Sequence, residues 1–379
     1  MSMKDIFCQD AAVAALRRAV ASGRVAGSYI FAGPEGVGRF TAAREWTKVL
    51  LCSQPSPGAQ EACGRCDSCR SFDGGEHPDF HHVYKELVEF TRDGKDKKAP
   101  VALSIDVIRE FLIEKVAQTP MFSRRKVFVV SEAEKLQGPA QNAMLKTLEE
   151  PPADSHIILL CTRLDKLLPT TLSRCQIVKF GPISEEKIVE ELSRRGVEKG
   201  RAGYWARFTD GSLGRAIWWS GLRLGEYDCY SVKRTLVSRA AKLDLADSVD
   251  FAQWISDTAK SIVDAWEDEA GNNRINRSDI GRTVSKSLIY MVATVFSDAM
   301  KISERPDKNG DRSVPGIVNL DQIEEIRRVA GQFDAERCAE VVAEAYKAMN
   351  WIEANTNEKL VLEDLLLGIG GCGTMAMES

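Results

Sequence analysis

The segment that most restricts the fold is a glycine-rich turn between an apolar run and a helical pattern. Residues 28–32, SYIFA, are a continuous apolar run of the kind found in buried strands, and GPEGVGRF follows at residues 33–40. Residues 40–52, FTAAREWTKVLLC, then have the apolar spacing of a helix. A strand, a glycine turn and a helix N-terminus in this order are the setting of a phosphate-binding loop. The turn therefore predicts an α/β domain of the P-loop type.

Other segments of the first 180 residues agree with this prediction. Residues 126–131, KVFVVS, and residues 156–162, HIILLCT, are continuous apolar runs typical of parallel strands covered on both faces. Residues 104–118 are amphipathic at helical spacing. Strands that alternate with helices indicate a doubly wound α/β domain.

The remainder of the chain has a helical pattern. Ser184 is expected to be an N-cap, although Lys187 stands where a capping box has Glu or Gln. From Ala202 onward we expect almost only helices, and their apolar stripes favour packing against other subunits. Two polar segments rich in Gly, Asn and Asp, at residues 271–281 and 303–316, are expected to be connections between helices.

The glycine turn departs from the nucleotide-binding pattern G-x-x-x-x-G-K-[ST]. Gly33 and Gly38 occupy the two glycine positions, and Gly36 adds a third glycine. Arg39 replaces the lysine that reaches the phosphates, and a guanidinium does not substitute freely for an ammonium group. Phe40 replaces the hydroxyl residue that helps to hold Mg²⁺, and a phenyl ring cannot bind the ion.

A second departure concerns the other side chain that supports the metal. The strand at residues 126–131 is of the type that ends in Asp-Glu, but Ser131 stands at the aspartate position and Glu132 remains. Both metal-holding side chains are thus lost. We therefore expect a decayed ATPase that does not hydrolyse ATP. ATP or ADP could still lie on the backbone amides of the turn, and the sequence leaves nucleotide binding open.

Four cysteines form a pattern typical of a metal site. Cys63, Cys66 and Cys69 lie in two successive C-x-x-C steps, and Cys52 precedes them. Four thiolates with this spacing favour a tetrahedral structural Zn²⁺ over free thiols or a redox pair. The insert between residues 52 and 69 is polar and rich in Pro and Gly, so a metal would help to order it. His77, His81 and His82 are alternative ligands.

Composition and charge limit the remaining function classes. The chain of 379 residues has a formal net charge of −4, so a protein that grips DNA alone is disfavoured. No apolar run approaches the roughly 20 residues that cross a bilayer, and the first ten residues lack a secretory pattern. We expect a cytoplasmic protein whose ten cysteines are reduced or bind metal.

Two further segments resemble a known family. QNAMLKTLEEPP at residues 141–152 and TTLSRCQIVKF at residues 170–180 are similar to the clamp-loader branch of the AAA+ proteins. The cysteine insert lies where bacterial clamp-loader subunits carry a zinc module. The resemblance covers about the first 220 residues and returns in NTNEKLVLEDLLLG near the end.

The resemblance implies a division into three domains and a role in a complex. It implies an AAA+ domain at residues 1–180 with the zinc module at 52–69, a helical lid at 181–217, and a helical collar at 218–379. Arg174 of Ser-Arg-Cys would be the arginine finger that acts in trans on a neighbouring ATPase. Thr162 and Arg215 are weaker matches to sensor residues.

Within the family, the loss of the loop residues favours the delta-prime type over the ATP-hydrolysing gamma/tau type. The implied partners are gamma/tau and delta subunits in a pentameric loader of DNA polymerase III, with the sliding clamp and primed DNA reached through the complex. Two alternatives stay open: an active gamma/tau-type ATPase subunit, and a zinc-dependent nucleic-acid-binding protein.

Overall fold

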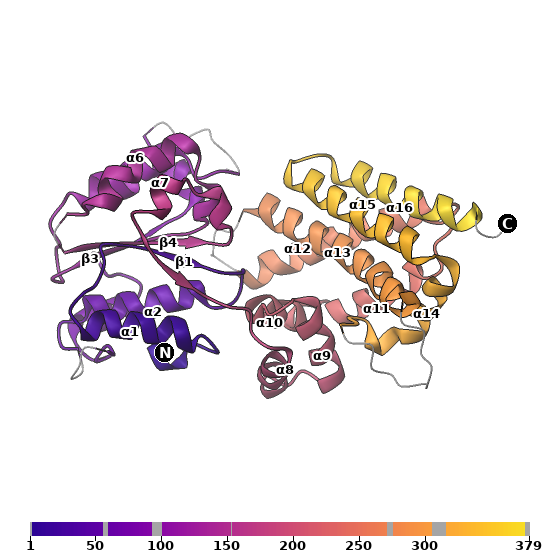
Figure 1. Ribbon diagram of the computed structural model, residues 1–379, viewed down its shortest axis with the longest axis horizontal. Coiled ribbons are helices and arrows are strands. Elements are labelled where there is room, and N and C mark those ends of the chain that lie inside the picture. The colour runs from indigo at the N-terminus through magenta and orange to yellow at the C-terminus, as the bar shows by residue number, and fades with distance from the viewer. Residues whose placement is uncertain are drawn as a thin grey trace. The chain divides into compact units, whose positions relative to one another are not determined.

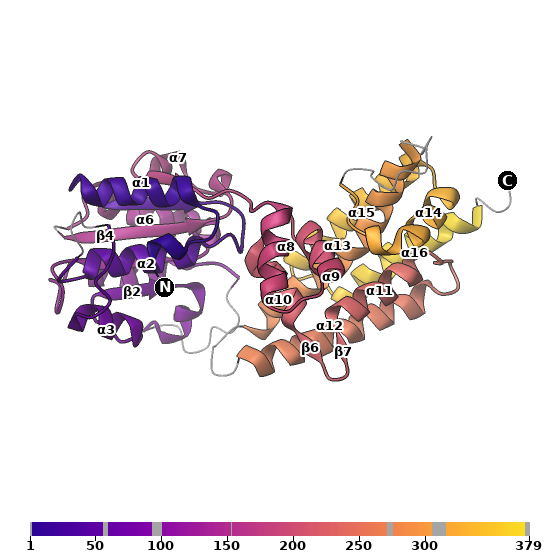
Figure 2. The ribbon, with the colours of Figure 1, turned by 90° about the horizontal axis from the view of Figure 1, so that it is seen from below.

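The chain forms two compact units in the computed structural model (Figures 1 and 2). The first unit comprises Met1–Ile183 and Ser212–Gly214, and the second comprises Ser184–Gly211 and Arg215–Ser379. The expected lid, residues 181–217, thus falls mainly within the second unit, and the division into three domains stays a prediction. The structure describes residues 2–55, 60–92, 101–152, 154–270, 276–304 and 316–375. Parts of the zinc insert and of both predicted polar connections lie outside these ranges.

A five-stranded parallel sheet forms the centre of the first unit. The strands, in their order across the sheet, are β2 (Phe80–Val83), β3 (Lys126–Val130), β4 (Ser155–Cys161), β1 (Ser28–Ala32) and β5 (Gln176–Lys179). In the register of the central strands, Ile30 pairs with Leu159 on one side and Ile177 on the other. The predicted parallel α/β domain is confirmed.

Helices cover both faces of this sheet (Figure 1). One face carries α1 (Asp10–Ala21), α2 (Arg39–Leu51) and α3 (Asp67–Asp73), and the other carries α4 (Ile105–Ile108), α5 (Glu114–Val116) and α6 (Gly138–Glu149). A π-helical stretch, Arg109–Ile113, joins α4 to α5, so the predicted helix at 104–118 forms with a bulge. Shorter elements are η1 (Met3–Asp5), η2 (Lys85–Phe90), η4 (Ala133–Lys135), η5 (Leu164–Lys166) and α7 (Pro169–Leu172).

Alternate side chains of β1 fill two separate cores. Tyr29 and Phe31 pack with Trp46 of α2, and the rings of Tyr29 and Trp46 lie 4.7 Å apart. Ile30 faces the other core, which contains Met144 of α6. Because successive side chains of a strand point to opposite faces, a strand between two helical layers must be apolar throughout, which is why its sequence shows no alternation.

The second unit is almost entirely helical, as predicted. Its elements are α8 (Glu185–Arg194), α9 (Lys199–Phe208), α10 (Leu213–Gly221), β6 (Arg223–Leu224), β7 (Tyr227–Asp228), α11 (Cys229–Ala240), α12 (Ser248–Ala270), α13 (Arg277–Glu304), η6 (Leu320–Gln322), α14 (Ile323–Gln332), α15 (Ala335–Glu353) and α16 (Glu358–Met375). Helix α13 packs against α11, α12, α14 and α15. Ser184 is the N-cap of α8, as expected, but its side chain makes no capping hydrogen bond.

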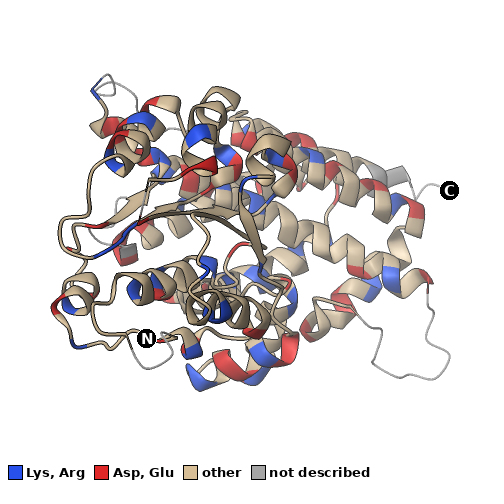
Figure 3. Cartoon of the chain, turned by 60° about the vertical axis from the view of Figure 1, so that its left-hand side comes forward, with Lys and Arg blue, Asp and Glu red and all other residues tan. Residues whose placement is uncertain are grey.

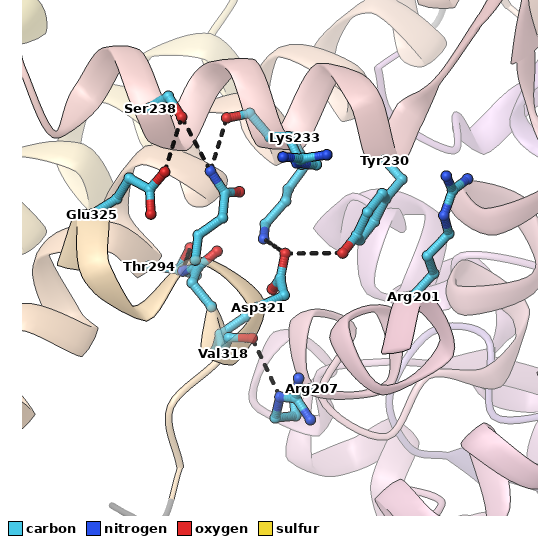
Figure 4. Close-up of polar contacts among 12 residues, drawn as sticks. Arg201, Arg207, Tyr230, Lys233, Ser238, Thr294, Val318, Asp321 and Glu325 are labelled. Atoms are coloured by element: carbon cyan, nitrogen blue, oxygen red, sulfur yellow. Dashed lines mark hydrogen bonds and ion pairs between the residues drawn. The ribbon is translucent and has the colours of Figure 1, made fainter. Parts of the chain in front are cut away.

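A buried polar group fixes the segment that precedes α14 (Figure 4). Nζ of Lys233 on α11, whose side chain is 0% exposed, lies 2.5 Å from a carboxylate oxygen of Asp321. The hydroxyl of Tyr230 donates to the same carboxylate at 2.9 Å. Arg207 of α9 donates to the carbonyl oxygen of Val318 at 3.2 Å. These contacts attach residues 318–321 to two helices that lie far away in the sequence.

Basic and acidic residues are interspersed along the helices of both units (Figure 3), in keeping with the small net charge of −4. Among the described residues, no helix combines the length and apolar character needed to cross a membrane.

Candidate functional site

The glycine loop connects β1 to α2, and its glycines meet distinct backbone demands. Gly36 and Gly38 have φ angles of +72° and +95°, which favour glycine over residues with a Cβ. A Cβ on Gly33 would lie 2.3 Å from the carbonyl oxygen of Phe180, so glycine is required for the close approach. Gly38 is the N-cap of α2, and the first N–H groups of this helix therefore lie at the loop. This arrangement suits an anion, and phosphate binding stays a prediction.

Arg39 lies against the loop. Its Nε donates to the carbonyl oxygen of Pro34 at 3.2 Å. Burial lowers the pKa of Arg39, and the neighbouring carboxylate of Glu134 opposes this shift. Glu134 in turn accepts a hydrogen bond from the hydroxyl of Thr162 at 2.6 Å. Arg39, the cation predicted to face a phosphate, thus lies near the carboxylate of Glu134. Thr162, a weaker match to a sensor residue, holds that carboxylate by its hydrogen bond.

An uncharged cluster of Phe40, His82 and Ser131 lies at the C-terminal end of the glycine loop. The ring of Phe40, 39% exposed, lies 4.9 Å from the ring of His82. Nε2 of His82 and Oγ of Ser131 are 2.8 Å apart and share a hydrogen bond. Burial lowers the pKa of His82 to about 4, so the imidazole is neutral at neutral pH. The cluster supplies no anionic oxygen for Mg²⁺, which prefers carboxylates, phosphates and water.

The carboxylate that remains after Ser131 is already paired. Glu132 has a φ of +52° and lies 3.0 Å from Nζ of Lys85 and 2.5 Å from Nζ of Lys135. Because two ammonium groups engage this side chain, it is a poor candidate for a metal ligand.

A short return of the chain touches the glycine loop. The segment Ser212–Gly214 belongs to the first unit, and the N–H of Gly214 donates to the carbonyl oxygen of Gly36 at 2.8 Å. A Cβ on Gly214 would lie 3.0 Å from the Cα of Gly36, so the small residue permits this contact. The residues just before Arg215, one of the two weaker sensor matches, therefore contact the loop through the backbone of Gly214.

The structure brings the four predicted cysteines together. The sulfur atoms of Cys52, Cys63, Cys66 and Cys69 all lie within 4.8 Å of one another. The 3.9 Å between Cys52 and Cys66 is far longer than a disulfide. It is close to the roughly 3.8 Å between sulfurs of a tetrahedral site with Zn–S bonds of about 2.3 Å. The cluster therefore fits a tetrahedral metal ion.

Backbone amides surround these sulfur atoms. The N–H groups of Cys63, Cys66 and Cys69 donate to the sulfurs of Cys52, Cys63 and Cys66 at 3.3, 3.3 and 3.4 Å. Burial raises the pKa of Cys66, but hydrogen bonds from Ser53 and from the N–H of Cys69 outweigh it and bring the pKa to about 5. Amides that stabilise thiolate charge are what a metal–sulfur site requires.

The three nearby histidines have other partners. Nδ1 of His77 accepts the N–H of Asp79, so Nε2 carries the proton that faces the hydroxyls of Ser68 and Ser123 at 3.0 and 3.1 Å. His81 stacks on Phe128 at 4.6 Å, and His82 bonds Ser131. The cysteines form the candidate metal site without these imidazoles.

Arg174 follows α7 and contacts two neighbouring helices of the first unit. Its Nε lies 2.9 Å from a carboxylate oxygen of Glu149, the last residue of α6. Its Nη1 donates to the carbonyl oxygen of Thr170 at 3.0 Å. The side chain is 29% exposed, so part of the guanidinium is accessible to another molecule.

Arg174 and the glycine loop lie at opposite ends of the parallel strands, Arg174 at their amino ends and the loop at their carboxyl ends. Arg174 stands two residues before β5, and Gly33 stands one residue after β1. The two strands are parallel, with Tyr29 paired to Gln176 and Ala32 paired to Lys179. At about 3.3 Å per residue, the length of these strands alone separates their amino ends from their carboxyl ends by roughly 10 Å. Arg174 therefore cannot reach a phosphate on its own chain's loop.

Sequence reasoning missed two residues that contact the predicted site, which are Glu134, the acceptor for Thr162, and Glu149, the acceptor for Arg174. It expected His82 only as an alternative metal ligand and missed the contacts of His82 with Phe40 and Ser131. A signal exists for Glu149, because it lies within QNAMLKTLEEPP, the segment at residues 141–152 that resembles the clamp-loader branch.

The first half of the chain is similar to known subunits of bacterial DNA polymerase III. Residues 8–184 match the family model described as DNA polymerase III, delta subunit. DNA polymerase III subunit delta' of Bacillus subtilis is 29% identical over 195 residues, which are 52% of this chain and 54% of that protein. DNA polymerase III subunit delta' of Escherichia coli is 27% identical over 326 residues, 85% of this chain and 82% of that protein.

The chain spans about half the length of the Bacillus relative. A solved structure of a DNA polymerase III gamma subunit-related protein from Thermotoga maritima covers 94% of this chain and 98% of its own, with 15% identity and a TM-score of 0.41.

Proposed function

We propose that this chain, which is similar through residues 8–184 to the clamp-loader subunits of bacterial DNA polymerase III, is a delta'-type subunit. In this role it does not hydrolyse ATP, and it donates Arg174 to the ATP site of a neighbouring subunit. The observation that carries the proposal is the position of Arg174 at the amino ends of the strands, whereas the glycine loop lies at their carboxyl ends.

The side chains around the loop support the proposed absence of hydrolysis. Phe40 and Ser131 replace the two metal-supporting residues, and neutral His82 links them. Phosphoryl transfer depends on a metal ion that neutralises the developing charge on the phosphates. The glycine turns of the loop are kept, so the proposal concerns turnover of nucleotide and leaves its binding open.

The contribution of Arg174 is electrostatic. A guanidinium supplied in trans stabilises the charge that develops on the transferred phosphoryl group, and such groups contribute about 10³–10⁵ in rate in GTPases. Donation in trans also makes hydrolysis depend on assembly. The implied neighbours are gamma/tau and delta subunits in a cytoplasmic loader that opens a sliding clamp on primed DNA.

The four cysteines would hold Zn²⁺ in a structural role. Cys52, Cys66 and Cys69 are buried, and four thiolates complete a tetrahedral shell with no position left for a catalytic water. Bound zinc would supply the cohesion that a short polar insert lacks.

The decisive experiment measures ATP turnover in a complex that depends on Arg174 alone. The full chain is reconstituted with gamma/tau-type and delta-type subunits of the same organism, and the Ser-Arg-Cys arginines of the gamma/tau-type subunits are replaced by alanine. Arg174→Ala is expected to lower the remaining kcat at least 100-fold without changing assembly. Arg92→Ala is a matched control, because Arg92 also lies in the first unit and pairs at 2.8 Å with a glutamate, Glu114.

Normal turnover in the Arg174→Ala complex would refute the donation in trans. Mg²⁺-dependent ATP turnover by the isolated chain that is abolished by Arg39→Ala would instead identify an active gamma/tau-type ATPase subunit.

A further inference from the structure

Two contacts restrict the side chain of Arg174 before any partner arrives. Glu149 accepts from Nε at 2.9 Å, and the carbonyl oxygen of Thr170 accepts from Nη1 at 3.0 Å. Both acceptors belong to ordered helices, since Glu149 ends α6 and Thr170 lies in α7. Among the described residues, Nη2 has no acceptor within hydrogen-bond distance. The contacts thus fix the inner part of the guanidinium and leave one terminal NH₂ group available.

We propose that Glu149 is a positioning residue for Arg174, which holds the guanidinium in the rotamer that meets the neighbouring subunit's phosphate. This inference rests on the proposed function. A long arginine side chain loses rotamer freedom when it engages a partner. If the carboxylate holds the arginine in that rotamer before the neighbour binds, the loss of rotamer entropy does not add to the activation free energy of phosphoryl transfer. The guanidinium then stabilises the transition state without this cost.

The exposure of the pair argues against a role in stability. The side chains of Arg174 and Glu149 are 29% and 57% exposed, and exposed ion pairs contribute little to folding. A purely structural pair would therefore leave turnover unchanged when it is broken. A latch that withholds Arg174 from the neighbour would have the opposite effect, because breaking it would raise turnover.

The test uses the reconstituted complex in which turnover depends on Arg174 alone. Glu149→Ala is expected to lower kcat roughly 5- to 30-fold, with the upper bound set by the rotamer freedom of an arginine. KM for ATP should not change, because the positioned group acts on the transition state. Glu149→Gln keeps an oxygen that can accept from Nε, so its kcat should lie between those of the wild type and Glu149→Ala.

Two comparisons separate positioning from other effects. Glu150→Ala is the matched control, since Glu150 is the adjacent exposed glutamate, and its kcat should equal that of the wild type. In the Arg174→Ala background, Glu149→Ala should have no further effect on kcat, because the residue that it positions is gone. The melting temperature of the full chain should not change in either glutamate variant.

The outcomes distinguish this inference from the function on which it rests. If Arg174→Ala abolishes turnover while Glu149→Ala and Glu149→Gln leave kcat unchanged or raise it, the positioning role is wrong and the donation in trans stands. If Arg174→Ala itself leaves turnover intact, the proposed function fails, whatever the glutamate variants show.

Discussion

Replacing Asp321 with asparagine removes the carboxylate that lies 2.5 Å from the buried ammonium group of Lys233. Lys233 is 0% exposed, whereas the side chain of Asp321 is 19% exposed, so the lysine left behind cannot turn to water. Breaking a buried ion pair on one side is strongly destabilising, because it leaves an uncompensated charge. The substitution therefore raises the free energy of the folded second unit and lowers its stability.

The size of this cost follows from the proton equilibrium of the lysine. Burial lowers the pKa of Lys233 from 10.5 to about 8, although Asp321 opposes the shift. In the variant, Lys233 can escape an unpaired charge by losing its proton, and at pH 7 this costs about 1–2 kcal/mol relative to the wild type. The weakened hydrogen bonds to Lys233 and Tyr230 add about 1 kcal/mol. We expect a loss of about 2–3 kcal/mol at pH 7.

The same argument fixes the sign of the pH dependence. The folded-state pKa of Lys233 is lowered, so the unfolded chain binds more protons and the contribution of Lys233 to stability increases as pH rises between about 8 and 10.5. In the variant this window extends to lower pH. The difference between variant and wild type should therefore grow by about 1.4 kcal/mol per unit below pH 8 and shrink above it.

Urea unfolding at pH 6, 7, 8 and 9 measures this difference. Tryptophan fluorescence reports mainly on the second unit, because Trp46 alone of the seven tryptophans lies in the first. Asp257→Asn is the matched control, since Asp257 pairs with Lys260 on the exposed surface of α12 and should change stability by less than about 0.5 kcal/mol. A loss below about 1 kcal/mol at pH 6, or a loss that does not shrink by pH 9, would refute the reasoning.

Two further predictions concern the first unit. Metal analysis should find one zinc per chain, and Cys66→Ser should expose residues 60–73 to proteases; less than one zinc with unchanged protection would exclude the site. Asp79→Asn should cost about 2–4 kcal/mol, because the buried carboxylate accepts the N–H groups of Met121, Phe122 and Ser123 at 2.6, 2.8 and 2.6 Å. These bonds, despite burial, lower the pKa of Asp79, so its contribution is present at neutral pH and is lost as pH falls through the folded-state pKa. Unchanged hydrogen exchange at residues 121–123 would contradict this account.

The sequence predicted those strands whose side chains are buried on both faces. β1, β3 and β4 are continuous apolar runs because helices cover both sides of the sheet. β2 and β5 were not predicted, since they are short edge strands, FHHV and QIVK, that keep polar side chains. Two-residue strands such as β6 and β7 leave no periodic pattern at all.

The candidate site was predictable where its residues are close in sequence. The glycines and the cysteines were found by spacing alone. The contact between His82 and Ser131 joins residues 49 positions apart, and it arises because β2 and β3 are neighbours in the sheet. The contact between Glu149 and Arg174 likewise depends on how α6 and α7 pack, which a one-dimensional pattern does not specify.

Arg174 and the glycine loop lie at opposite ends of the strands of one sheet, so they belong to two different surfaces of the first unit. A contact between the Arg174 surface of one subunit and the loop surface of the next is therefore head-to-tail. Such a contact repeats around a ring or a spiral and cannot form a two-fold pair. A member whose loop surface lacks metal ligands can serve the neighbour on one side only. Under the proposed function, this chain would be such a member and would occupy a fixed position in the assembly, at one end of the series of working ATP sites.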